Sequence, residues 1–202
     1  MMRVTEEIFS QGGLILPTLF LVSFVIWYSG FLSLYRFYTF HRARKNFMAG
    51  MDMLLHGENY EPHTGNSRFD TLLILFKRVP EKNVKMFKVL YREFLMGAVG
   101  DLSQGLTTIS VWISVAPLLG LLGTVTGMVA TFRSIMLFGT GSPGFMAEGI
   151  SIALVTTKTG LAVAVPALLF HLFLVNMRNR LKQNLIQDGK VVAAKISVGE
   201  TV

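Results

Sequence analysis

The sequence contains no cysteine and few charged residues: charged side chains make up 15% of its 202 residues, and hydrophobic ones 51%. Without cysteine the chain cannot form a disulfide bond, a thiolate metal site, an iron–sulfur centre or a cysteine nucleophile. Soluble domains usually carry about 25% charged residues, and the mean hydropathy of this chain is +0.51. The composition therefore argues against a water-soluble enzyme and indicates a membrane protein.

Sequence motifs of soluble enzymes are missing as well. There is no G-x-x-x-x-G-K-[ST] phosphate loop, no H-E-x-x-H zinc motif and no G-x-S-x-G nucleophile motif. The histidines, at positions 41, 56, 63 and 171, are scattered along the chain, which predicts no metal site. We therefore expect neither enzymatic activity nor a cofactor.

Long intervals without Asp, Glu, Lys or Arg mark three segments of the chain. They are Ile8–Tyr35 (28 residues), Leu102–Phe132 (31 residues) and Gly149–Met177 (29 residues), the last interrupted by Lys158. About 20 apolar residues in a helix cross a hydrocarbon core of about 30 Å. The sequence thus predicts an all-α, polytopic membrane protein whose three transmembrane helices extend into a cytoplasmic helical bundle.

Lys and Arg are distributed very unevenly about these three segments. The stretch Arg36–Gly105 contains eleven and the tail after Met177 contains five, whereas the N-terminal flank and the connection between the second and third segments contain one each. Because positively charged loops stay in the cytoplasm, we expect the N-terminus outside and the C-terminus inside. The net charge of +7 then reflects topology and attraction to anionic lipids, and no nucleic-acid partner is expected.

These intervals divide the chain into six expected parts. They are an outer N-terminus with the first span (1–36), a cytoplasmic helical segment (37–105), the second span (106–137), a short outer hairpin (138–148), the third span (149–177) and a cytoplasmic tail (178–202) that continues the third helix to about Gly189. The hairpin is rich in Gly, Ser and Pro and sets the second and third spans side by side as an antiparallel pair.

The second span carries a glycine motif, APLLGLLGTVTGM, at residues 116–128. Gly120, Gly123 and Gly127 allow close helix approach, and the Gly123–Gly127 spacing is the small-x-x-x-small pattern of membrane helices. Helix packing alone would explain these glycines. Thr124 lies in the same turn, however, and hydroxyls that face a helix bundle are typical of a cation or proton path.

The third span carries four consecutive polar residues, Thr156, Thr157, Lys158 and Thr159. Lys158 lies roughly 13 Å from the outer end of its helix, a depth similar to that of the threonine motif in the second span. A charge at such depth costs at least about 2.5–3.5 kcal/mol, so we expect it to face a wet cavity or an acidic partner. The nearest acid of the third span is Glu148, at the outer mouth, so a counter-ion would belong to another protein.

At these residues the sequence resembles the ExbB/TolQ/MotA family of ion-driven motor subunits, most closely its three-span ExbB/TolQ branch. The resemblance extends over about Leu102–Leu172 and rests on the glycine motif of the second span and on GIS-ALVTT-x-x-GLAVAVPALL in the third. It implies a homopentamer in the bacterial inner membrane that encloses a single-span ExbD/TolR-like protein with a membrane aspartate. The translocated ion is H⁺, with Na⁺ as the alternative, and its flow drives a TonB- or TolA-like protein that energises outer-membrane transport.

The resemblance also assigns roles to individual residues. Thr124 and Thr157 match the threonines that line the family's ion path. Two positions depart from the family pattern: Ile152 stands where a glutamate is frequent, and Lys158 where a small or neutral residue is usual. These departures favour an alternative interpretation, in which the chain is a non-conducting structural or scaffold subunit of a related complex.

Overall fold

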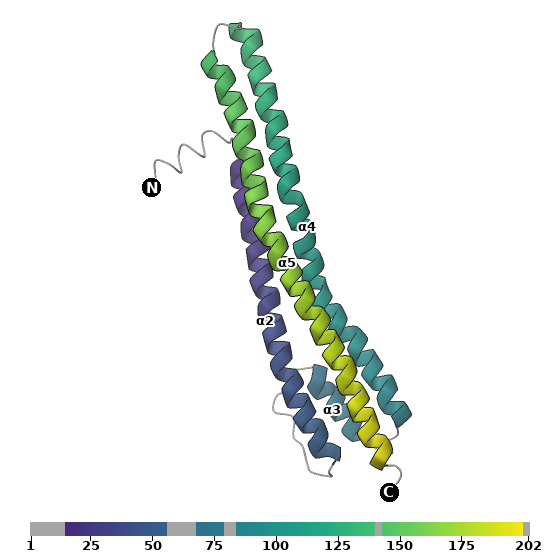
Figure 1. Ribbon diagram of the computed structural model, residues 1–202. Coiled ribbons are helices and arrows are strands. Elements are labelled where there is room, and N and C mark those ends of the chain that lie inside the picture. The colour runs from purple at the N-terminus through teal and green to yellow at the C-terminus, as the bar shows by residue number, and fades with distance from the viewer. Residues whose placement is uncertain (1–14, 56–67, 79–83, 140–142, 200–202) are drawn as a thin grey trace. The chain divides into compact units, whose positions relative to one another are not determined.

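The computed structural model describes residues 15–55, 68–78, 84–139 and 143–199, and every element in these ranges is an α-helix. The four helices are α2 (Ile15–Leu55), α3 (Arg68–Arg78), α4 (Val84–Phe138) and α5 (Pro143–Gly199) (Figure 1). The expected all-α fold is confirmed. The expected N-terminal flank and the tip of the hairpin, residues 140–142, lie outside the described ranges.

Helices α2, α4 and α5 are long and apolar enough to cross a membrane. Helix α4 has 55 residues and α5 has 57, which at 1.5 Å per residue is about 80 Å, far more than a hydrocarbon core of about 30 Å. Each helix therefore contains a membrane span and continues beyond it without a break. The expectation of three helices that can span a membrane and that continue beyond the span is confirmed.

The helices divide into two compact units. The first, here called the span unit, comprises the described residues up to Phe31 together with those of Thr107–Phe173; the second, the bundle unit, comprises those of Leu32–Leu106 and those from Leu174 onward. The expected cytoplasmic ends of the charge-free intervals in the sequence lie within about five residues of the boundaries between the two units. The exact position of the bilayer along the helices remains a prediction.

In the span unit, α4 and α5 pack as an antiparallel pair through small residues. A Cβ atom on Gly127 would lie 2.7 Å from the Gly149 carbonyl oxygen, and one on Gly160 would lie 2.9 Å from the Ala116 carbonyl oxygen. Helix α2 packs on α5 through aromatic side chains instead: the Trp27 ring lies 5.6 Å from that of Phe170. Lipid gives no hydrophobic drive for helix association, so such close contact is the main attraction available.

In the bundle unit the core is rich in aromatic side chains. Phe47, Phe69, Phe87 and Tyr91 are almost completely buried within one cluster that also includes Leu185. The Phe69 ring lies 4.8 Å from that of Phe94 and 5.3 Å from that of Phe47, separations typical of favourable aromatic pairs. The short helix α3 contributes its apolar face, which includes Phe69, to this core.

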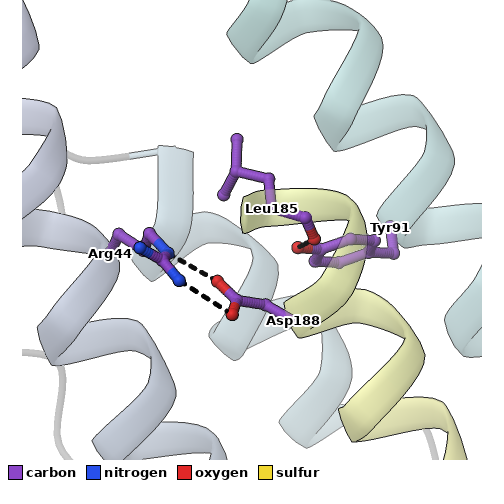
Figure 2. A network of polar contacts seen from close by, with 4 residues as sticks. All are labelled: Arg44, Tyr91, Leu185 and Asp188. Carbon is purple, nitrogen blue, oxygen red and sulfur yellow. Dashed lines mark hydrogen bonds and ion pairs between the residues drawn. The ribbon is translucent and has the colours of Figure 1, made fainter. Parts of the chain in front are cut away.

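A polar network joins three helices of the bundle unit (Figure 2). Arg44 of α2 donates two hydrogen bonds to the Asp188 carboxylate of α5, at 2.6 and 3.0 Å, and the Tyr91 hydroxyl of α4 donates to the Leu185 carbonyl oxygen at 2.6 Å. The bond to Asp188 raises the pKa of Arg44, and burial together with the nearby Asp188 charge raises the pKa of Tyr91. Arg44 thus stays cationic and Tyr91 stays a neutral donor.

Both ends of α5 differ from the sequence expectation. The helix begins at Pro143, inside the expected hairpin 138–148, because proline suits the first position of a helix, where its missing N–H costs nothing. It also runs to Gly199 instead of ending near Gly189. At Gly189 the ring of Tyr91 occupies the space that a Cβ would need, so this glycine serves close packing and not helix termination.

We expect Asp188→Ala to destabilise the protein by about 2–3 kcal/mol, because it leaves the mostly buried Arg44 guanidinium without its partner. Thermal unfolding in detergent measures this. The matched control is Asp101→Ala, which removes an acid from the exposed ion pair with Arg68 and should cost no more than about 1 kcal/mol. Equal losses in the two variants would contradict a structural role for the Arg44–Asp188 pair.

Candidate functional site

The candidate site is the contact between the glycine motif of α4 and the threonine run of α5. A Cβ on Gly120 would lie 3.3 Å from Thr157 Cα and 3.5 Å from Gly160 Cα. A Cβ on Gly123 would overlap the Thr156 side chain. The structure therefore brings the two motifs into direct contact, and all three predicted packing glycines of α4, including Gly127, face α5.

Thr157 lies at the edge of this contact. Its hydroxyl donates to the carbonyl oxygen of Ala153 in its own helix at 3.1 Å and reaches that of Gly120 across the pair at 3.4 Å. The side chain is half-buried. A hydroxyl has one proton and two lone pairs, so Thr157 keeps acceptor capacity on the side that the helix pair leaves open.

Thr124 lies one helical turn from Gly120, the residue of α4 that contacts Thr157. It stands four residues after Gly120, which places both on one stripe of α4, and its half-buried side chain donates to the Leu121 carbonyl oxygen at 2.7 Å. Because Gly120 contacts Thr157, Thr124 lies within about one helical turn, roughly 6 Å, of the same level. The match of the two threonines in membrane depth stays a prediction.

The four consecutive polar residues of α5 do not share one environment. Successive residues are rotated by about 100° around a helix, so Thr157 and Thr159 lie on nearly opposite sides. Thr156 is fully buried, and its hydroxyl donates to the carbonyl oxygens of Ile152 and Ala153 at 3.0 Å. Thr159 donates to the Val155 carbonyl oxygen of its own helix at 2.8 Å. This geometry favours helix packing for Thr156 and singles out Thr157, whose hydroxyl reaches the Gly120 carbonyl oxygen of α4.

Lys158 is exposed on the surface of the span unit. Among the described residues it forms no ion pair, and the only acid of the described span unit is Glu148. Glu148 is exposed near the start of α5, ten residues or about 15 Å along the helix axis from Lys158. The structure therefore does not bring these two charges together.

The sequence did not lead us to predict the small residues of α5 that form the other side of this contact. Gly149, Ala153 and Gly160 approach α4 as closely as the α4 glycines approach α5. The signal was present, since Gly149 and Ala153 have the small-x-x-x-small spacing. No group of three or more His, Asp or Glu side chains that could hold a metal ion occurs among the residues that the structure describes.

We expect Gly127→Ala to loosen the α4–α5 pair, because the added methyl group meets the backbone of α5 at Gly149 and Ala153. Overpacking of this kind costs about 1–3 kcal/mol, more than the gain of about 1 kcal/mol in helix propensity. The control is Gly100→Ala on the same helix, where a Cβ meets nothing within 4 Å. Thermal unfolding should show a loss for the first variant and none for the second; a stabilised Gly127→Ala would contradict the packing.

Comparison with known proteins places these motifs in a family. A sequence profile of the MotA/TolQ/ExbB proton channel family matches residues 65–187, more than half of the chain. An ExbB homologue of Methanothermobacter thermautotrophicus is 48% identical over 67 residues, 33% of this chain and 23% of that protein. The biopolymer transport protein exbB1 of Vibrio cholerae is 39% identical over 66 residues, 32% of this chain and 29% of the relative.

A third relative is the biopolymer transport protein ExbB of Helicobacter pylori, 41% identical over 71 residues, 35% of this chain and 49% of the relative. The chain thus spans about half or less of the length of the curated relatives that it matches. The profile covers both the glycine motif and the threonine run, together with the helices that hold them in contact. The chain belongs to the MotA/TolQ/ExbB proton channel family, a family of channel-type proteins rather than of enzymes.

Proposed function

We propose that the chain is the ion-path subunit of an ExbB/TolQ-like motor, which couples an H⁺ or Na⁺ gradient to mechanical work on a TonB- or TolA-like protein. The observation that carries the proposal is the position of Thr157: its half-buried hydroxyl reaches across to Gly120, beside Thr124, at the edge of the α4–α5 contact. Membership of a proton channel family supports H⁺ as the translocated ion, and the names of the relatives, biopolymer transport proteins, support a role in transport.

The chemistry of the path follows from the hydrogen bonds of these two threonines. Each hydroxyl donates its proton to a carbonyl oxygen of its own helix, which leaves its lone pairs to accept. A track lined by acceptors attracts a cation, a protonated water chain or a dehydrated Na⁺ alike. Thr124 and Thr157 therefore form one wall of the proposed track.

Among the residues that the structure describes, none supplies a carboxylate beside this wall, and Ile152 occupies the position where the family frequently has glutamate. Proton transfer needs a group that titrates, so the acid has to come from a partner. An ExbD/TolR-like helix with a membrane aspartate meets this need, and a homopentamer around it would close the track. The positive charge of Lys158 would then pair with a carboxylate of the assembly.

The alternative function is a scaffold subunit that assembles in the same way and conducts no ion. Two observations favour it: Ile152 replaces a carboxylate, and the exposed Lys158 places a permanent cation next to Thr157 in the sequence. A cation at this position repels H₃O⁺ and Na⁺ unless an acid neutralises it. The two functions therefore differ in whether ions pass, and not in how the helices pack.

We expect Thr157→Val to reduce ion flux by at least about tenfold, because valine keeps the shape of threonine and removes the hydroxyl that a cation would contact. The measurement uses vesicles that hold the chain together with its single-span partner, with a pH-sensitive dye for H⁺ and a sodium indicator in a parallel set.

Thr159→Val is the matched control, because this residue lies on the opposite side of α5 and donates only within its own helix. Its flux should stay within about twofold of the parent chain. If both variants conduct like the parent, the path does not pass Thr157. If the parent complex passes neither ion, the scaffold function replaces the motor.

Orientation in the membrane has a separate test, since the chain has no cysteine and any introduced thiol is unique. A membrane-impermeant maleimide added to right-side-out vesicles should label Gly144→Cys, in the exposed first turn of α5, because few positive charges flank the hairpin. Lys182→Cys, in the basic tail, should react only after the vesicles are opened. The reverse pattern would place the C-terminus outside.

A further inference from the structure

The bundle unit contains a cavity of about 570 Å³ between α2, α3 and α4. This volume is within the usual range of ligand pockets, about 300–1,000 Å³. One part of its lining is basic and polar, with Arg36, Arg68 and Asp101, and another part is aromatic, with Phe40 and Phe69. The rings of Phe40 and Phe69 lie 4.9 Å apart. The cavity therefore joins an anion-binding side to an apolar wall.

Two arginines, one from α2 and one from α3, lie near two glycines of α4. A Cβ on Gly97 would overlap the Arg68 guanidinium, and a Cβ on Gly105 would lie 4.0 Å from Arg36 Nη1. Asp101 stands midway between these glycines, four residues from each, so all three lie on one stripe of α4. The missing side chain at Gly97 thus makes room for the Arg68 guanidinium, whereas Arg36 Nη1 lies at ordinary contact distance from the Gly105 position.

Only one of these two cations has its charge compensated. Arg68 forms an ion pair of 2.7 Å with Asp101, so these two charges cancel. Arg36 forms no ion pair within the described part of the chain, and it lines the same cavity. The lining therefore carries one net positive charge, at the guanidinium of the exposed Arg36.

The position of the cavity along the chain indicates the source of the ligand. Arg36 is the first charged residue after the first charge-free interval, and Asp101 is the last before the second. Both helices therefore pass from apolar to charged sequence at the level of the cavity, which is where lipid headgroups lie. Basic pockets between helices at this level bind the headgroups of anionic lipids.

We propose that this cavity binds the phosphate group of an anionic phospholipid such as phosphatidylglycerol, with Arg36 as the phosphate ligand. A guanidinium matches phosphate through paired N–H donors. Phe40, packed on the buried Phe69 ring, provides the apolar wall against which the glycerol and the first acyl carbons pack. The lipid would join α2 to α3 and α4 at the boundary where α2 leaves the bilayer. This site requires only that the chain is inserted in a membrane, and it does not depend on ion conduction.

The test is lipid binding to the purified full-length chain in detergent, followed by native mass spectrometry and by the lipid-induced rise in unfolding temperature. We expect phosphatidylglycerol to bind, and Arg36→Gln to weaken its binding by about tenfold. Arg42→Gln is the matched control: it removes the same charge from an exposed position of the same helix that does not line the cavity. It should bind the lipid like the parent chain.

Three further measurements identify the ligand and its place. Phosphatidylcholine has no net negative charge, and inorganic phosphate has no acyl chain to pack on the apolar wall. At the same concentration, both should therefore bind at least tenfold more weakly than phosphatidylglycerol. Ala43→Leu fills the cavity without a change of charge and should also weaken binding. Equal effects of Arg36→Gln and Arg42→Gln, or undiminished binding by Ala43→Leu, would overturn the site. Equal binding of inorganic phosphate would replace the lipid by a soluble anion.

Discussion

The close approach of α4 and α5 is the constraint on which the candidate site depends. At Gly127 and Gly160 the backbone of one helix lies where a side chain would otherwise stand, so only residues without a Cβ fit. In lipid this contact cannot draw on the hydrophobic effect, and it holds through van der Waals packing and hydrogen bonds between helices. The same closeness brings the Thr157 hydroxyl to the Gly120 carbonyl oxygen. The close approach of the two helices therefore accounts both for their packing and for the hydrogen bond between them.

Threonine is suited to such a contact because it satisfies its own donor. The hydroxyls of Thr124, Thr131, Thr156 and Thr159 all donate to carbonyl oxygens three or four residues earlier in their own helices. An apolar surrounding therefore meets no unpaired O–H group, which would be costly. The lone pairs of each threonine hydroxyl can still accept hydrogen bonds. Whether it serves an ion depends on burial, which is complete at Thr156 and partial at Thr157, and this difference separates a packing residue from a candidate path residue.

The sequence predicted what depends on local pattern and missed what depends on distant partners. Charge-free intervals located the three spanning helices, and the α4 glycines indicated the helix contact. The Arg44–Asp188 pair joins residues 144 positions apart, and the Arg36 cavity is built from three helices; neither leaves a periodic signal. Four consecutive polar residues in α5 suggested one polar face, whereas 3.6 residues per turn distribute them around the helix. At Gly189, a residue that commonly ends helices instead lies under the Tyr91 ring.

Both candidate functions have to provide water or an acid beside the ammonium group of Lys158. An ammonium group inside a membrane span is stable only beside water or an acid, and the described span unit offers no acid near it. In the proposed function, Thr124 and Thr157 form one wall of a track and need other helices to close it. In that proposal both features are incomplete in a single chain, and the same kind of neighbour, a helix with a carboxylate in the membrane, would complete them. A scaffold would need that carboxylate only to neutralise Lys158, whereas a motor would also need it to exchange ions. The charge state of the carboxylate during turnover therefore decides between them.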